Sequence, residues 1–228
     1  MGVHQSFSRR NIIGRKMKVI PAILTNDSKE LKSSLRQLKN IVKRIQIDFI
    51  DGDFVENKTL SFFVLNQIDE LKDFEVDLHL MAKNPIRLIE QLKSIKINRF
   101  IAHIEELEDQ SLFINKVLQA KMKPGLAIDL DSSINLINKI NIQKVDIILL
   151  LAVKAGFAGQ KFNPKVLGKI KKLKELKQKE KLSFEICVDG GISFETAKCC
   201  FLVGADSVAV GSFIWQQQDI RKAISSFE

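Results

Sequence analysis

The sequence predicts an α/β protein with a single (β/α)8 TIM barrel. Its 228 residues are within the ~200–250 that such a barrel needs. From Lys18 onward, eight short apolar runs alternate with longer amphipathic segments, which is typical of a parallel sheet covered by helices. Eight strands favour a closed barrel over an open, doubly wound sheet. No linker rich in Pro, Gly or Ser divides the chain, so we expect one barrel domain over residues 18–228.

Short apolar, β-branched runs give the strands, and segments with helical periodicity give the helices between them. The predicted strands are Val19–Leu24, Arg44–Ile50, Glu75–Leu80, Arg99–Ile104, Gly125–Ile128, Val145–Leu151, Phe184–Val188 and Ser207–Val210. The predicted helices include Ser28–Val42, Ile86–Ile95, Leu112–Ala120, Ser132–Ile140, Pro164–Lys179 and Phe194–Val203.

The first 17 residues stand apart from this pattern. They include Arg9, Arg10, Arg15 and Lys16 and no acidic residue, and Met17 is itself a potential start. We expect a disordered, basic N-terminal extension over residues 1–17. A targeting peptide is the alternative.

Composition indicates a soluble, core-forming chain, with 45% apolar and 28% charged residues. No apolar run reaches the ~18 residues of a membrane helix, so we expect a cytoplasmic protein with no membrane partner. The net charge of +9 is concentrated in a lysine-rich segment around Ile170 and Leu173. That pattern favours one exposed amphipathic helix over a nucleic-acid surface, because no aromatic residues are interleaved to stack on bases.

Three cysteines, Cys187, Cys199 and Cys200, make an odd number and form no CxxC pair. This argues against a disulfide or zinc knuckle, and we expect small buried apolar side chains.

Two predicted strands carry polar residues at positions suited to chemistry. Side chains alternate faces along a strand, so Ile45, Ile47 and Phe49 should face the helices. The opposite face, directed into the barrel, should hold Gln46, Asp48 and Ile50. In the next strand Asp77, His79 and Met81 share one face. Burying such groups is costly unless partners or a ligand satisfy them, and barrels place their chemistry at the C-terminal ends of strands.

Five motifs in order resemble those of the ribulose-phosphate 3-epimerase family, over a stretch from about Val19 to the C-terminus. They are Ile47–Asn57, Asp77–Met81, Gly156–Gln160, Val188–Ile192 and Val210–Ser212. Each follows the expected strand. Singly they are weak, because a lone Asp-Gly or Gly-Gly is usually a turn.

The resemblance implies an isomerase of the pentose phosphate pathway that inverts the carbon next to the ketone of a ketopentose phosphate, converting D-ribulose 5-phosphate to D-xylulose 5-phosphate. Asp48 and Asp189 would be the two acid/base carboxylates, and a divalent metal (Zn, Mn, Fe, Co or Mg) would stabilise the enediolate. The alternative for Asp189 is a turn residue that caps the Gly190-Gly191 loop. The sequence does not predict the oligomeric state, and a homo-oligomer is one alternative.

The glycines predict a phosphate site, because a residue without Cβ lets backbone N–H groups approach a dianion. Barrels commonly bind phosphate after strands seven and eight, and the resemblance adds a mobile loop after strand six. Tight turns alone are the competing explanation. The candidate substrate- and phosphate-binding residues are His79, Met81, Gly156, Phe157, Ala158, Gly159, Gln160, Gly190, Gly191, Gly211 and Ser212.

The chain departs from the family in its metal ligands. Asp48, His79 and Asp189 match the family's set, but Gln46 stands where a second histidine is expected. A glutamine offers only a neutral amide oxygen, which disfavours Zn²⁺, shifts preference toward Mg²⁺ or Mn²⁺, or abolishes tight binding.

Other positions facing the substrate also differ from the family. A serine is replaced by Ala22, a methionine by Ile50, and an Asn-Pro pair by Lys154-Ala155. His103 stands where relatives also carry histidine, and we expect it to be a core residue or to support the metal ligands.

Two other functions compete with an active epimerase. One is a barrel that binds a phosphosugar without epimerising it. The other is a decarboxylase or hexulose-phosphate synthase, but those enzymes need Asp-x-Lys on the second strand, and Ile50 occupies the lysine position here.

Overall fold

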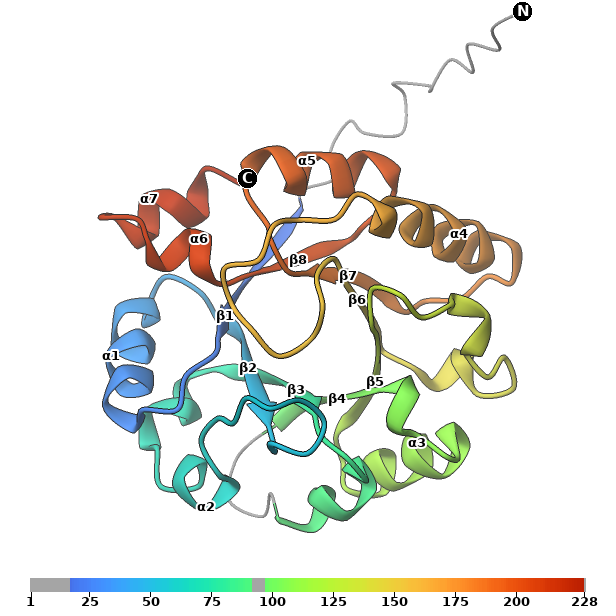
Figure 1. Ribbon diagram of the computed structural model, residues 1–228, viewed down its shortest axis with the longest axis horizontal. Helices are drawn as coiled ribbons and strands as arrows, with labels where there is room; N and C mark the ends of the chain where they lie inside the picture. The colour runs from blue at the N-terminus through green and yellow to red at the C-terminus, as the bar shows by residue number, and fades with distance from the viewer. Residues whose placement is uncertain (1–16, 92–96, 228) are drawn as a thin grey trace, which may run out of the picture.

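The computed structural model describes residues 17–91 and 97–227. Eight parallel strands close into one barrel, with β8 pairing back onto β1, and helices surround it (Figure 1). The predicted TIM barrel is therefore confirmed. The expected extension of residues 1–17 lies outside the described residues except for Met17. No helix among the described residues is long and apolar enough to cross a membrane.

All eight predicted strands are present, with ends shifted by at most two residues. They are β1 (Lys18–Ile23), β2 (Arg44–Ile50), β3 (Glu75–Met81), β4 (Ile97–His103), β5 (Lys123–Ile128), β6 (Ile147–Leu151), β7 (Glu185–Asp189) and β8 (Ser207–Val210).

The α-helices of the outer layer are α1 (Ser28–Leu38), α2 (Phe62–Leu65), α3 (Gln110–Gln119), α4 (Lys165–Lys179), α5 (Phe194–Val203), α6 (Ser212–Trp215) and α7 (Ile220–Ser225). Short 3₁₀ helices complete it: η2 (Asp69–Asp73), η3 (Pro85–Gln91), η4 (Ile104–Glu106), η5 (Ile134–Leu136) and η6 (Ile142–Lys144). Lysine-rich α4 is amphipathic as expected, with Val166, Ile170 and Leu173 buried.

The predicted helix over residues 132–140 is wrong, because only the 3₁₀ turn η5 forms there. The Gln110 side chain bonds the Leu136 carbonyl and the Asn138 N–H, and the Asn138 side chain accepts from the Ile140 N–H. These side-chain bonds compete with the helical ladder for the backbone groups. Likewise, the predicted helix over residues 86–95 is the 3₁₀ helix η3 as far as Gln91, and residues 92–96 lie outside the described part.

Side chains alternate between the two faces of each strand, and this alternation produces two buried layers. Ile45, Ile47 and Phe49 belong to the large core between barrel and helices, whereas Ile50 and Met81 belong to the smaller core inside the barrel. The predicted facing of β2 is therefore confirmed. Cys187 and Cys200 are buried as expected, but Cys199 is exposed, so that expectation fails at one of the three cysteines.

The base of the barrel holds a network of buried charges. Asp77 is 1% exposed and accepts hydrogen bonds from Arg44 (2.7 Å) and Arg99 (3.2 Å). Arg44 also bonds Glu185 at 2.8 Å. Because Asp77 is fully paired here, its polar character on the inward face of β3 is structural, and His79, two residues further along, needs a separate explanation.

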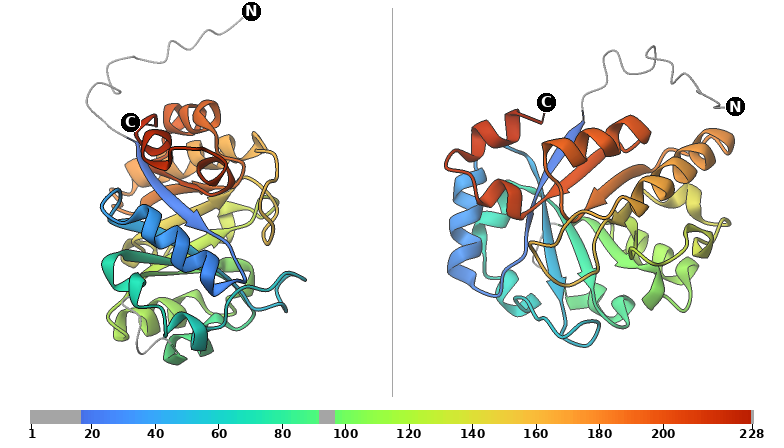
Figure 2. Two further views of the ribbon diagram at one scale, coloured as in Figure 1. Left: turned by 90° about the vertical axis from the view of Figure 1, so that its left-hand side faces the viewer. Right: turned by 45° about the horizontal axis from the view of Figure 1, so that its top comes forward.

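Loops that follow the strands gather at the opposite end. The loops after β2 and β6 project from the same end of the barrel (Figure 2, left), and the loop from β6 to α4 crosses the mouth (Figure 1). Asn57 Nδ2 donates to the Gly156 carbonyl at 2.6 Å, which ties these two loops together.

Candidate active site

A pocket of about 310 Å³ opens at this C-terminal end of the barrel. It brings together most of the predicted site residues from β2, β3 and the loops after β6, β7 and β8. Those that line it are Asp48, His79, Met81, Gly156, Phe157, Ala158, Gly159, Gln160, Asp189, Gly190, Gly191, Gly211 and Ser212. Gln46 is not among them, but it lies directly beneath Asp48 and contacts both aspartates.

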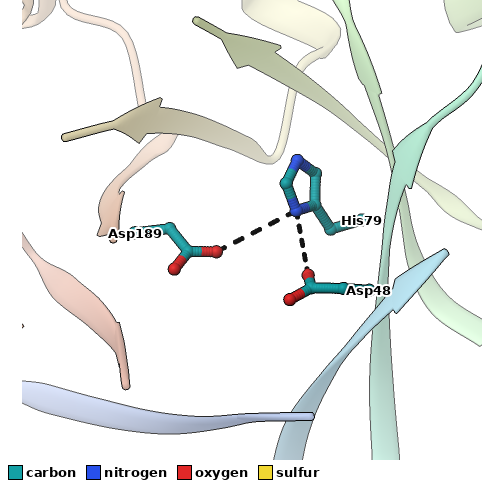
Figure 3. Close-up of side chains that lie close together, drawn as sticks. All are labelled: Asp48, His79 and Asp189. Atoms are coloured by element: carbon teal, nitrogen blue, oxygen red, sulfur yellow. Dashed lines mark hydrogen bonds and ion pairs between the residues drawn. The ribbon is translucent and has the colours of Figure 1, made fainter. Parts of the chain in front are cut away.

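Asp48, His79 and Asp189 converge on one point at the floor of the pocket (Figure 3). One ligand atom from each lies within 4.8 Å of the other two. His79 Nδ1 is 2.9 Å from Asp48 Oδ1 and 3.9 Å from Asp189 Oδ2. Parallel pairing explains part of this, because β2 and β3 align Asp48 with His79 in register. Asp189 is the last residue of β7 and reaches the same point from another strand.

The Gln46 side chain joins the two aspartates. Its Nε2 donates to Asp48 Oδ1 at 2.9 Å and to Asp189 Oδ2 at 2.5 Å. The predicted facing of Gln46 toward this site is confirmed. In this arrangement the amide nitrogen, not the oxygen, is directed at the carboxylates, so Gln46 could offer its oxygen to a cation only if the amide turned over.

Burial changes the protonation of these groups. It raises the pKa of Asp48 to about 7. Burial, together with the nearby Asp48 charge, raises the pKa of Asp189 to about 6. It also lowers the pKa of His79 to about 4, so the imidazole is neutral near pH 7. Among the described residues, no lysine or arginine forms an ion pair with either aspartate, in contrast to Asp77 at the base.

The donor set fits a divalent cation. Two carboxylate oxygens and one imidazole nitrogen face one another over less than 5 Å, and this geometry suits a metal that accepts both oxygen and nitrogen ligands. Asp48, His79 and Asp189 are thus the residues that would hold it.

The upper wall of the pocket is built from glycine-rich loops. Gly190 and Gly191 have φ of +101° and +64°, and a Cβ on Gly191 would lie 2.3 Å from the Phe162 backbone nitrogen. Glycine is therefore required at this turn, whether or not it also binds an anion. Gly159 N–H donates to Ser212 Oγ at 3.1 Å, which joins the β6–α4 loop to the loop after β8.

Sequence reasoning missed several residues of the pocket. Phe213, Trp215 and Gln216 line it directly after the Gly211-Ser212 motif, and the Trp215 indole donates to the Ala22 carbonyl at 2.8 Å. The sequence signal that could have identified these residues was their position just beyond the end of a predicted strand. Lys154, noted only as a departure from the family, is the sole lysine or arginine among the described residues that line the pocket.

Fold and site together define a TIM-barrel protein with a two-carboxylate centre at the C-terminal ends of its strands. Residues 18–215 match the model of the ribulose-phosphate 3 epimerase family. A ribulose-phosphate 3-epimerase of Bacillus subtilis is 32% identical over 211 residues, which cover 92% of this chain and 97% of the relative. Another of Methanocaldococcus jannaschii is 28% identical, covering 92% and 89%. The chain belongs to the ribulose-phosphate 3-epimerase family.

Solved structures outside the family share the fold. The 3-hexulose-6-phosphate synthase of Salmonella typhimurium superposes with a TM-score of 0.63 at 16% identity, covering 92% of this chain and 96% of that one. A tryptophan synthase α-subunit of Pyrococcus furiosus gives 0.67 at 12% identity, covering 93% and 98%. At these identities the likeness concerns the barrel alone.

The raised pKa of Asp48 predicts a gain in stability when its charge is removed. In chelator-treated protein, Asp48→Asn should raise Tm by several degrees at about pH 8. The gain should vanish as pH falls from about 7 to about 4. Below the unfolded-state pKa the carboxyl is neutral in both states, and as pH rises the unfolded chain ionises first, so the buried charge costs stability only at the upper end.

Thermal unfolding across this pH range measures the effect. Asp131→Asn, which alters a side chain that is 67% exposed, is the matched control and should show no such trend. A gain that stayed constant with pH would mean that Asp48 is not strained by burial.

Proposed function

We propose that this protein inverts the carbon next to the ketone of a ketopentose phosphate, converting D-ribulose 5-phosphate to D-xylulose 5-phosphate. The observation that carries the proposal is the convergence of two carboxylates, the buried Asp48 and the half-buried Asp189, on one point of the pocket floor. Membership of the family supports the same reaction. Inversion needs one group to remove a proton and another to return one on the opposite face.

The protonation of the aspartates suits this role. With pKa values of about 7 and about 6, the pair can hold one proton between its members near neutral pH. The ionised member removes the proton from the carbon, and the protonated member returns one to the other face. In the reverse reaction their roles exchange. Gln46, bonded to both, keeps the two carboxylates aimed at a common point.

A divalent cation held by Asp48, His79 and Asp189 would stabilise the negative charge of the enediolate. We propose Mg²⁺ or Mn²⁺ ahead of Zn²⁺, because the set provides a single nitrogen and otherwise oxygen ligands. Because Gln46 replaces a histidine ligand expected in this family, the metal should also be weakly held.

The phosphate is proposed to lie at the glycine-rich wall. Backbone groups of Gly190, Gly191, Gly211 and Ser212, with the loop Gly156–Gln160, border that part of the pocket. Lys154 is close enough to the same pocket to add positive charge.

A second candidate, binding without epimerisation, rests on Gln46. Its amide already bonds both carboxylates, and a site held in this way need not take up metal. A decarboxylase or a synthase of the hexulose-phosphate type is supported only by the shared barrel fold. The fully buried Ile50 stands where such an enzyme would need a lysine.

The first test replaces each carboxylate. Asp48→Asn and Asp189→Asn should each lower turnover by ~10²–10⁴-fold, because an amide can neither take up nor return the proton. The fold should persist, since the side chains are nearly isosteric. A coupled assay for xylulose 5-phosphate measures turnover, and Asp131→Asn should keep it unchanged. Near-normal turnover in either site variant would remove that residue from the acid/base pair.

The second test concerns the departure from the family. Gln46→His should create a second nitrogen ligand and tighten Zn²⁺ binding by at least ~10-fold, the scale on which even supporting residues alter metal affinity. Turnover should rise in step. Metal analysis, calorimetry and the coupled assay measure both effects, with Gln46→Leu as the control that loses the amide without adding a ligand.

The two effects of Gln46→His can separate. If zinc affinity rises while turnover stays absent, Ala22 or Lys154-Ala155 has disabled catalysis and the binding function is favoured. If zinc affinity does not rise, residue 46 does not contribute to the metal site, and the proposal for that residue fails.

A further inference from the structure

The loop that follows β2, residues 51–58, is fixed to the barrel at both of its ends. At its start Asp51 Oδ1 accepts the Asp53 N–H at 2.8 Å. At its end the Thr59 N–H donates to the Ile50 carbonyl at 3.1 Å, and Thr59 Oγ1 accepts the Ile50 N–H at 2.8 Å. A side chain carried by this loop therefore has a fixed position relative to strand β2.

Asn57 lies near the end of this loop and uses both atoms of its amide. Its Oδ1 accepts the Lys58 N–H at 2.8 Å, and its Nδ2 donates to the Gly156 carbonyl at 2.6 Å. Turning the amide over would set its oxygen against the Gly156 carbonyl oxygen, and both are acceptors. The bond to Lys58 therefore fixes the direction in which Asn57 presents its N–H group to the β6–α4 loop.

The same two loops also touch through a glycine that has no room for a side chain. Gly156 has φ of +108°, and a Cβ there would lie 2.6 Å from Val55 Cγ2. Val55 and Asn57 thus meet one residue of the β6–α4 loop, the first by packing and the second by a hydrogen bond. Strands β2 and β6 lie on opposite sides of the closed barrel, so these contacts span its mouth (Figure 1).

The β6–α4 loop is tied together internally, so it keeps its shape where it borders the pocket. Gln160 Nε2 donates to the carbonyls of Lys154 and Phe157 at 2.7 and 2.9 Å. On the side of β8, the Gly159 N–H donates to Ser212 Oγ at 3.1 Å. The position of this loop over the pocket therefore depends on the neighbouring loops that hold it.

We propose that Asn57 is a positioning residue for the proposed epimerisation, because its side chain holds the β6–α4 loop across the mouth of the pocket before substrate arrives. The inference deepens the proposed function and rests on it. Asn57 is not among the described residues that line the pocket, whereas Gly156 is. Asn57 therefore acts on the substrate only through the loop that it holds.

The strength of one hydrogen bond sets the size of the effect. A neutral bond of this kind changes an equilibrium by a factor of ~3–10. Its loss lowers the fraction of protein with the loop in place, and the apparent affinity for substrate falls with that fraction. Bound substrate restores the loop through its own contacts, so kcat should change little. A residue needed only for stability would instead reduce the active fraction, which lowers kcat and leaves KM unchanged.

Two variants of the full chain separate the hydrogen bond from simple packing. Asn57→Asp is nearly isosteric and still accepts the Lys58 N–H, but it sets a carboxylate oxygen against the Gly156 carbonyl. Asn57→Ala removes the whole amide. If the bond holds the loop, Asn57→Asp is at least as severe as Asn57→Ala. If the side chain only fills space, the isosteric variant is the milder one.

Two further variants are matched controls. Lys58→Gln makes the same change in net charge as Asn57→Asp on the same loop and keeps the bond to Gly156. Asn66→Ala removes an amide that donates to the Gln91 carbonyl at 3.2 Å, away from the residues that line the pocket.

Hydrogen exchange and kinetics are measured on each protein. Exchange over residues 154–163 of the ligand-free protein, followed by mass spectrometry, includes the Gly159 amide that is bonded to Ser212. The exchange rate should rise ~3–10-fold in both Asn57 variants and stay at the wild-type value in both controls. In the coupled assay, KM for ribulose 5-phosphate should rise by a similar factor while kcat stays within ~2-fold.

These readouts separate the inference from the proposed function. Unchanged exchange in both Asn57 variants, or a milder effect in Asn57→Asp than in Asn57→Ala, overturns the role of the hydrogen bond whatever the enzymatic activity. Faster exchange with an unchanged KM, or a loss confined to kcat, overturns the positioning role. If the wild type shows no epimerase turnover, the proposed function fails, and the exchange rates alone decide whether Asn57 holds the loop.

Discussion

The site depends on two carboxylates that the barrel brings close together, with no lysine or arginine among the described residues paired to either of them. Asp48 and Asp189 come from different strands, and ligand atoms of both lie with His79 within 4.8 Å of one another. Burial raises the pKa of both toward neutrality, and the nearby Asp48 charge raises the pKa of Asp189 further. These shifts suit the proton transfer near pH 7 that we propose for the two aspartates, and the same group of ligands could hold a metal ion.

The two ends of the barrel treat buried acids in opposite ways. At the base, Asp77 is paired with Arg44 and Arg99, and the network stabilises the closed sheet. At the C-terminal end, the pair at the pocket floor has a neutral amide and a neutral imidazole as neighbours. The same residue type therefore has arginine partners at one end of the barrel and, among the described residues, none at the other end, where we propose that it carries out the chemistry.

Local patterns in the sequence predicted much of the fold and of the site. Period-2 alternation placed Gln46 and Asp48 inside the barrel, and the expected strands were all found, because parallel pairing is set by such apolar runs. The helix predicted over residues 132–140 failed, since bonds from Gln110 and Asn138 lie outside any periodicity. The direction of the Gln46 amide depends on a contact between β2 and β7, which are distant in sequence, so a single sequence does not reveal it.

The central claim is that two carboxylates act from opposite faces of the reacting carbon. It is tested most directly by converting ribulose 5-phosphate in D₂O and examining the first xylulose 5-phosphate formed by NMR and mass spectrometry. If one aspartate removes the proton and the other, already exchanged with solvent, returns a different one, the product carries deuterium at the inverted carbon from the first turnover. Product that retains its original hydrogen there would show that a single group carries the proton across, and would contradict the two-carboxylate account.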